Sequence, residues 1–160
     1  MFAVSVPSEL NIQKLASMIG TSRHVVYEYL EYLKDARIFN IVRMEGSGYR
    51  ILNKTEKIYL ENTNLAYILS NNVNPGTIRE AFFVNQILNN YTMNRNLVDS
   101  AITLSKSGDF LVEDKFTFEI GGKGKTNKQI RSLSDAYIAS DGIEYGFGEK
   151  IPLWLFGFLY

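Results

Sequence analysis

The hydrophobic pattern between residues 106 and 131 predicts a β-hairpin, followed by a glycine-rich exit and a short basic helix. Side chains alternate between the two faces of a strand, and in this segment the apolar residues fall on one face. These residues are Phe110, Val112, Phe116, Phe118 and Ile120. A turn at residues 113–115 keeps that face apolar on both strands, and it sets Asp109 directly opposite Glu119.

Asp109 and Glu119 are the first candidate site. Like charges opposite each other on paired strands lie roughly 5 Å apart at Cβ and destabilise the pairing. A divalent cation, a shared proton, a nearby lysine or solvent at the sheet end would compensate. An Asp and a Glu on neighbouring strands are also the hard-oxygen pair of Mg²⁺-dependent phosphodiesterases. An ordinary hairpin with a polar outer face is the alternative, and the pairing alone leaves both open.

Two amphipathic helices are predicted near the start of the chain. Asn11 precedes the first helix and Gly20 ends it, while Thr21 or Ser22 precedes the second, longer helix. The apolar stripe of the longer helix consists of Val26, Tyr29, Leu30 and Leu33. Helix, tight glycine turn and helix form the outline of a helix-turn-helix.

A wing is expected after these helices, from β-like segments at 38–44 and 49–52 that flank a turn at 45–48. The side chains that would contact nucleic acid from this winged helix-turn-helix are Arg23, His24, Tyr27, Arg43 and Arg50. Residues 1–54 nevertheless hold seven basic and five acidic residues, a weak excess for a phosphate-binding surface. Winged helices also dock proteins, so DNA binding and protein docking both stay open for this region.

The rest of the chain predicts a second, α/β region. Its elements are a strand at 57–61, helices at 65–69 and 78–90, a strand at 97–104, the hairpin, a strand at 136–139 and an apolar segment at 151–160. We expect a break at residues 74–76 and a cap at Thr77 for the longer helix. Its buried side would contain Ile78, Ala81, Phe82, Val84 and Ile87. Glu80 lies in the first turn, where an acid also interacts favourably with the helix dipole.

Composition narrows the choice of partners. The 160 residues contain 17 Lys and Arg against 17 Asp and Glu, so the net charge of zero creates no overall attraction to nucleic acid or membrane. Lys123, Lys125, Lys128 and Arg131 form the only concentrated basic run. The absence of cysteine, of a basic leader and of a long apolar run predicts a soluble, cytoplasmic protein without a membrane partner. The chain has no GxxxxGK[ST] phosphate-binding loop, so we expect no ATP hydrolysis by it.

The order of the second region resembles the PD-(D/E)XK nuclease core, with Glu80 on a helix, then Asp109 and Glu119 on successive strands. Over nearly all of its length the chain is similar to the C-terminal region of prokaryotic AAA-superfamily ATPases, a winged helix followed by a nuclease-like domain. The segments that carry the similarity are NIQKLASMIGTSRHVVYEYLEYLKDARIF, KIYLENTNLAYIL, GTIREAFFVNQIL, GDFLVEDKFTFEIGGKGKTNKQI and IPLWLFGFLY.

This resemblance implies an α+β protein, with a winged helix-turn-helix at 1–60 and a restriction-endonuclease-like domain at 61–160. It implies that Glu80, Asp109 and Glu119 are catalytic acids that bind Mg²⁺. The lysine of the E-x-K motif would fall at position 121, which is Gly121. Lys123 has the same parity along the strand, and we expect its side chain to reach back as the catalytic lysine. An ATPase module upstream in the parent chain would be a partner.

Three functions therefore remain open. In the first, the chain is the interaction and regulatory portion of an AAA-type ATPase, which binds nucleic acid or a partner and has a degenerate nuclease site. In the second, it is an active Mg²⁺-dependent nuclease of DNA or RNA. In the third, it is a scaffold that docks proteins only. The first predicts salt-sensitive binding through Arg23, Arg43, Arg50 and the run from Lys123 to Arg131. The second predicts cleavage that depends on Asp109, and the third predicts assembly with the ATPase module. Self-association stays open in all three.

Overall fold

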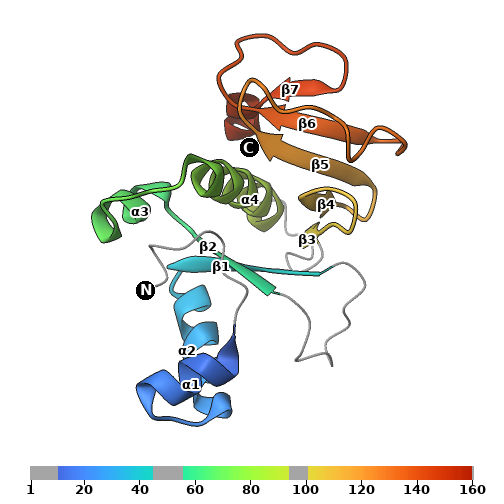
Figure 1. The fold of residues 1–160 in the computed structure, drawn as a ribbon. Helices are drawn as coiled ribbons and strands as arrows, with labels where there is room; N and C mark the ends of the chain where they lie inside the picture. The colour runs from blue at the N-terminus through green and yellow to red at the C-terminus, as the bar shows by residue number, and fades with distance from the viewer. Residues whose placement is uncertain (1–10, 45–55, 94–100, 160) are drawn as a thin grey trace.

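The computed structural model describes residues 11–44, 56–93 and 101–159. These residues form an α+β fold with one two-stranded and one five-stranded sheet, which confirms the predicted class (Figure 1). The helices are α1 (Ile12–Ile19), α2 (Arg23–Asp35), α3 (Thr63–Leu69), α4 (Pro75–Met93) and the 3₁₀ helix η1 (Leu153–Phe158). The strands are β1 (Phe39–Arg43), β2 (Glu56–Leu60), β3 (Ile102–Leu104), β4 (Phe110–Val112), β5 (Phe116–Gly121), β6 (Ala136–Ser140) and β7 (Lys150–Pro152).

The first two helices begin and end where their capping residues predict. The Asn11 side chain accepts a hydrogen bond from the backbone N–H of Lys14, and Gly20 ends α1 with a φ of 69°. Ser22 rather than Thr21 caps α2. The small core beneath these helices contains Ile12, Ala16, Val26, Leu30 and Phe39.

The predicted apolar stripe of α2 is only half correct. Val26 and Leu30 are buried, whereas Tyr29 and Leu33 are exposed. The buried pair packs against α1 and β1. These two elements cover only part of the apolar face of α2.

The strand that pairs with β1 is β2, in antiparallel register from Phe39 opposite Leu60 to Arg43 opposite Glu56. The predicted wing turn at 45–48 and its second strand at 49–52 lie outside the described residues. The sequence pattern did predict a strand at 57–61, shifted by one residue from β2, but not its pairing with β1.

Helix α4 starts earlier than predicted. The break at residues 74–76 and the cap at Thr77 are wrong, because Pro75 is the first helical residue. Proline suits that position, since its fixed φ is helical and its missing N–H would be unpaired there anyway. The Asn74 side chain caps the helix by accepting from the N–H groups of Gly76, at 2.7 Å, and Thr77, at 3.4 Å.

The five-stranded sheet has the order β3-β4-β5-β6-β7, antiparallel from β3 to β5 and parallel from β5 to β7. The predicted hairpin register is confirmed, with Phe110 opposite Phe118 and Val112 opposite Phe116. The predicted basic helix after the hairpin is wrong, because residues 122–133 form turns. This segment has no apolar stripe at helical spacing, and a short helix without packing is not stable.

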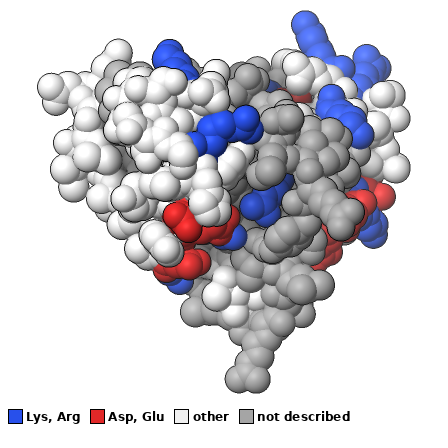
Figure 2. All heavy atoms as spheres, turned by 90° about the horizontal axis from the view of Figure 1, so that it is seen from below, with Lys and Arg blue, Asp and Glu red and all other residues white. Residues whose placement is uncertain are grey.

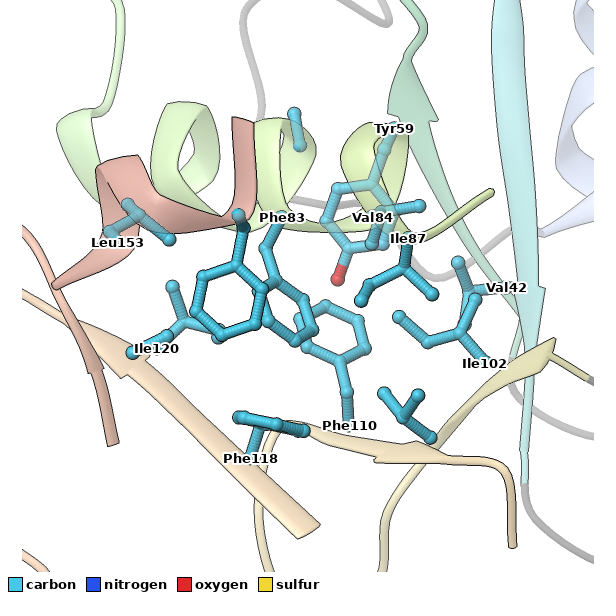
Figure 3. Close-up of a cluster of buried hydrophobic side chains, with 14 of the residues drawn as sticks. Val42, Tyr59, Phe83, Val84, Ile87, Ile102, Phe110, Phe118, Ile120 and Leu153 are labelled. Atoms are coloured by element: carbon cyan, nitrogen blue, oxygen red, sulfur yellow. The ribbon is translucent and has the colours of Figure 1, made fainter. Parts of the chain in front are cut away.

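Helix α4 lies between the two sheets and covers one face of the larger one (Figure 1). Its buried residues are Ala81, Phe83, Val84, Gln86 and Ile87, so Phe83 takes the central position that the pattern gave to Phe82. The Phe83 ring centroid lies 5.7 Å from that of Phe110 and 4.8 Å from that of Phe156. Tyr59 reaches from β2 into the same cluster (Figure 3). The division into domains at residue 60 stays a prediction, although this core draws side chains from both.

The connection from β5 to β6 crosses the opposite face of the larger sheet. Ile130 of this connection is buried against Ala136 and Ile138 of β6. Gly108 also lies beneath it, since a Cβ there would come within 2.8 Å of Thr117 and 3.3 Å of Ile130. Among the described helices, none is both long and apolar enough to cross a bilayer.

Candidate acidic site at the end of strand β5

Glu119 is fully buried in the middle of the larger sheet. It stands beside Ile138 of β6, on the face crossed by the connection rather than on the α4 face. Neither carboxylate oxygen receives a hydrogen bond of normal geometry from the described part of the chain. A buried carboxylate is costly unless a cation compensates its charge, so what lies next to Glu119 decides what this site is.

Lys125 supplies that charge. Its Nζ contacts Glu119 Oε2 and lies 3.7 Å from Asp109 Oδ2. Burial lowers the pKa of Lys125, but the hydrogen bond to Glu119 and the charges of Asp109 and Glu119 outweigh that effect and raise the pKa. Lys125 is therefore held as a cation at neutral pH.

The Lys125 side chain occupies the space that a side chain at position 121 would fill. A Cβ on Gly121 would lie 2.7 Å from the Cβ of Lys125 and 2.8 Å from its Cγ and Cδ. Gly121 is two residues after Glu119, so a side chain there would share its face of the strand. A turn in which the Lys125 N–H donates to the Gly122 carbonyl, at 2.9 Å, brings Lys125 back over the strand.

The lysine beside the carboxylates is thus Lys125, not the predicted Lys123. Lys123 is exposed, its carbonyl accepts a hydrogen bond from Lys150 Nζ at 3.3 Å, and its Cβ lies 4.0 Å from where a Cβ of Gly142 would be. The expectation assumed an extended chain after Gly121. The chain instead turns back after Gly121, through the hydrogen bond from the Lys125 N–H to the Gly122 carbonyl.

Asp109 lies one residue beyond the last pair of the β4–β5 register, so its predicted position directly opposite Glu119 stays a prediction, although Lys125 contacts both carboxylates. Its backbone N–H donates to the Phe118 carbonyl at 2.9 Å. Its Oδ2 accepts a hydrogen bond of 2.7 Å from the N–H of Ile120. The Asp109 carboxylate is therefore fixed in orientation by the backbone of β5.

Glu80 approaches this pair from α4. Its Oε2 accepts a hydrogen bond of 2.7 Å from the Tyr59 hydroxyl and lies 3.9 Å from Lys57 Nζ. Burial raises the pKa of Glu80, and the charge of Asp109 raises it further, while Tyr59, Lys57 and Lys125 act in the opposite direction. Asp109 and Lys125 thus influence the pKa of Glu80, whereas Glu119 faces the other side of the sheet, so the structure does not bring the three predicted acids together around one point.

Tyr59 and Lys57 were not predicted as site residues. Both lie on β2, in a segment whose sequence indicates only a short strand. Tyr59 is almost completely buried, and burial, together with the neighbouring Glu80, raises the pKa of its hydroxyl. Only the tertiary packing of β2 against α4 shows that its hydroxyl meets Glu80.

The donor set suits a hard divalent cation. Both carboxylate oxygens of Glu119 are buried, the Lys125 ammonium contacts one of them, and the same ammonium lies 3.7 Å from the carboxylate of Asp109. Oxygen donors of this kind are what Mg²⁺ and Mn²⁺ prefer. Within the described ranges, no three acidic or histidine side chains are gathered closely enough to ligate one ion together.

Two of the predicted nucleic-acid contacts of the first region lie next to acids. His24 lies 3.6 Å from Glu28 on the same helix, and Arg43 lies 3.9 Å from Glu31. Tyr27 packs at the edge of the small core, Arg23 is exposed, and Arg50 lies outside the described residues. On the face seen in Figure 2, Lys and Arg side chains are distributed in several separate groups.

On the connection from β5 to β6, the basic residues other than Lys125 are exposed. These are Lys123, Lys128 and Arg131. They share one segment with Lys125, so the exposed positive charges and the acidic site are joined by a short stretch of chain.

Comparison with known proteins gives no match: no family model, no curated protein and no solved structure corresponds to this chain. The similarity to the C-terminal region of AAA-type ATPases therefore stays a prediction from the sequence. The positions of Glu80, Asp109, Glu119 and Lys125 are what a functional proposal has to explain.

Proposed function

We propose that this chain hydrolyses phosphodiester bonds in nucleic acid with the help of a divalent cation. The observation that carries the proposal is the position of Lys125. Its side chain fills the space above Gly121, and its ammonium contacts Glu119 and lies 3.7 Å from Asp109. An Asp, a Glu and a lysine arranged in this way are the chemical groups of the PD-(D/E)XK site, although the lysine comes from a different position in the chain.

Asp109 and Glu119 would hold the cation. The cation would supply Lewis-acid stabilisation of negative charge on the phosphate and lower the pKa of a bound water. In the reaction, the oxygen of a water molecule bonds to phosphorus and the bond from phosphorus to the leaving sugar oxygen breaks. The attacking water loses a proton to solvent and the leaving oxygen takes one from solvent, so the products are a phosphate monoester and a sugar hydroxyl.

Lys125 would stabilise charge on the phosphate rather than take a proton. Its pKa is raised, because Glu119 and Asp109 outweigh the effect of burial, so the group stays protonated at neutral pH. A fixed ammonium next to the scissile phosphate stabilises the charge that builds on its oxygens in the transition state.

The exposed basic residues of the connection favour a polyanionic substrate. Lys123, Lys128 and Arg131 lie on the segment that carries Lys125, and this segment contains no acid between residues 122 and 134. Contacts of this kind hold phosphates without regard to base sequence. A nucleic acid bound along the connection would place a phosphate near Lys125.

The finer fold assignment is part of the same proposal. Glu80 on α4, the antiparallel strands bearing Asp109 and Glu119, and the parallel strand β6 are in the order of a PD-(D/E)XK core. The connection from β5 to β6 has turns in place of the expected helix. In the first region, α1, α2 and the β1–β2 pair supply parts of a winged helix-turn-helix.

The test is cleavage of labelled single- and double-stranded DNA and RNA with Mg²⁺ or Mn²⁺. Asp109→Asn and Glu119→Gln should each lower the rate by at least roughly 100-fold. Asp114→Asn is the matched control, because Asp114 is exposed in the hairpin turn. This variant should cleave at the same rate as the wild type. A pure wild-type protein that cleaves none of these substrates with either cation would contradict the proposal.

A second candidate is a nucleic-acid-binding, non-catalytic portion of an AAA-type ATPase. Lys125 favours it as well, because its ammonium already compensates both Asp109 and Glu119 without a metal ion. This candidate predicts binding that weakens with salt and depends on Lys128 and Arg131, with no cleavage under any condition. The cleavage assay separates the two candidates.

A further inference from the structure

Arg79, near the start of α4, is held above the end of strand β5. Its Nε donates a hydrogen bond of 2.8 Å to Oδ2 of Asp141, the residue that follows β6. The guanidinium also packs with its face on Gly122, since a Cβ there would lie 3.5 Å from Nη2 and 3.6 Å from both Cζ and Nη1. In Figure 1, α4 begins on the side toward which the arrows of β5 and β6 point. Two contacts therefore fix the orientation of the Arg79 side chain.

These contacts leave the two Nη groups of Arg79 available. Within the described ranges, neither Nη group donates a hydrogen bond or pairs with an acid, because the one polar contact of Arg79 is made by Nε. The side chain is 28% exposed, so a ligand can reach it. The N–H donors of a guanidinium lie in one plane and match the spacing of two phosphate oxygens. Arg79 is thus held in a position to bind an anion.

A second cation lies on the other side of the same strand end. Lys125 occupies the space beside Gly121, and Arg79 occupies the space beside Gly122. Successive residues of an extended chain point to opposite faces, so the two cations flank the backbone from both sides. Lys123, which is exposed, follows directly. Ligands of open sheets bind at the carboxyl ends of parallel strands, and here that end carries positive charge from both α4 and the connection.

We propose that Arg79 is a phosphate-binding residue, whose Nη groups hold the backbone of a nucleic acid where it passes the end of β5. The identity of the ligand rests on the proposed function, in which a nucleic acid lies along the connection. The inference adds a contact from α4 to that path. Asp141 is then a positioning residue, because it fixes the guanidinium through Nε.

The ion pair of Arg79 and Asp141 also joins α4 to the end of β6, and a purely structural role is the alternative. The two roles differ in what they require. A structural pair needs both members equally, whereas phosphate binding needs the guanidinium alone. Arg79→Met and Asp141→Asn break the same pair and therefore separate the two roles.

The experiment measures binding of labelled single- and double-stranded DNA to the full chain by fluorescence anisotropy. EDTA is present so that no DNA is cleaved, and the salt concentration is varied. Arg79→Lys keeps the charge but not the planar donors. Arg37→Met is the control, since Arg37 is also paired with an acid, Glu61, and contacts Asn89 of α4. Asn89 lies about 15 Å along the helix from Arg79.

Arg79→Met should weaken binding of both DNA forms by about 10-fold and reduce the slope of log affinity against log salt by about 1. Asp141→Asn should bind DNA at least as tightly as the wild type, because the amide oxygen still accepts from Nε and a negative charge is lost. Arg79→Lys should keep the slope and lose about threefold in affinity. Arg37→Met should stay within about twofold of the wild type, because its charge is screened at that distance.

A folded Arg79→Met variant with the affinity and slope of the wild type would overturn the inference. Equal losses in Arg79→Met and Asp141→Asn would do the same, as would a wild type that binds neither form of DNA. If the wild type binds DNA but cleaves none, the proposed hydrolysis fails, while the ranking of the variants still decides the role of Arg79. If the wild type cleaves DNA and Arg79→Met binds it normally, the proposed function stands and this inference alone fails.

Discussion

Helix α2 and the end of strand β5 both carry charged residues that the sequence marks as candidates for function, but the two regions hold their charges differently. On α2, His24 has a side chain that is 83% exposed and pairs with Glu28 four residues away. On β5, Glu119 is fully buried and its cation comes from the next connection. The first pair lies in one helix and is solvated, whereas the second is buried and joins β5 to the connection that follows it.

In a chain of zero net charge, this difference indicates which charged residues are candidates for function. An exposed ion pair contributes between zero and about 1 kcal/mol, so its members are easily replaced. A buried carboxylate and its cation must be placed together, because either one alone is strongly destabilising. The sheet end is therefore the region where substitutions should have large and specific effects.

Removing the buried cation should have the largest effect. We expect Lys125→Met to lower the free energy of unfolding by about 3 kcal/mol, because it leaves the Glu119 carboxylate buried without compensation. Lys123→Met removes the same charge from an exposed position and should change stability by less than about 0.5 kcal/mol. Urea denaturation checks both, and equal effects of the two substitutions would refute the distinction between the regions.

Neutralising Glu80 should stabilise the protein at neutral pH. Burial raises the pKa of Glu80, so the folded state binds this proton more tightly than the unfolded state does. Stability from the protonated form is present below the unfolded pKa and is lost as the pH rises through the folded pKa. Glu80→Gln avoids this loss and should be more stable than the wild type at pH 7.

The advantage of Glu80→Gln should shrink as the pH is lowered toward 4.5, the ordinary pKa of a glutamate side chain. Exposed Glu144→Gln serves as the control and should follow the wild type at every pH. Denaturation curves between pH 4 and pH 8 provide the measurement. An advantage of Glu80→Gln that grows as the pH falls would contradict a raised pKa of Glu80 in the folded state.

The smallest effects are expected on α2. Arg23→Glu should change stability by less than about 0.5 kcal/mol, since Arg23 is exposed. In a salt titration of DNA binding, it should leave the slope nearly unchanged, whereas Lys128→Glu and Arg131→Glu should each reduce the slope by about 1. If Arg23→Glu reduced the slope more than Lys128→Glu and Arg131→Glu did, the nucleic-acid-binding surface would lie in the first region.

The hairpin shows how much the sequence could predict. Strict alternation determined the register of Phe110 opposite Phe118, and with it the neighbourhood of Asp109 and Glu119, because a slip by one residue would expose the whole apolar face. The sequence also predicts helix α4, but it places the start of the helix too late. Proline indicates a break in the chain as well as a first helical residue, and at Pro75 the second meaning applies.

The parts of the site that could not be predicted depend on tertiary packing. Lys125 reaches Glu119 through a turn at Gly122 and Gly124, and a glycine-rich segment has no periodicity from which its path can be derived. Tyr59 meets Glu80 because β2 packs against α4, a contact between elements that the sequence assigned to separate domains.

The central claim is that Lys125 takes the place of a lysine at position 121, and moving the lysine back tests it most directly. The measurement is the cleavage rate with Mg²⁺ for the wild type, Lys125→Gly and the double variant Gly121→Lys/Lys125→Gly. Glycine at position 125 removes the Cβ, Cγ and Cδ atoms that a Cβ at position 121 would meet at 2.7–2.8 Å. We expect Lys125→Gly to lose cleavage and the double variant to regain it. A folded double variant as inactive as Lys125→Gly would contradict this placement of the lysine.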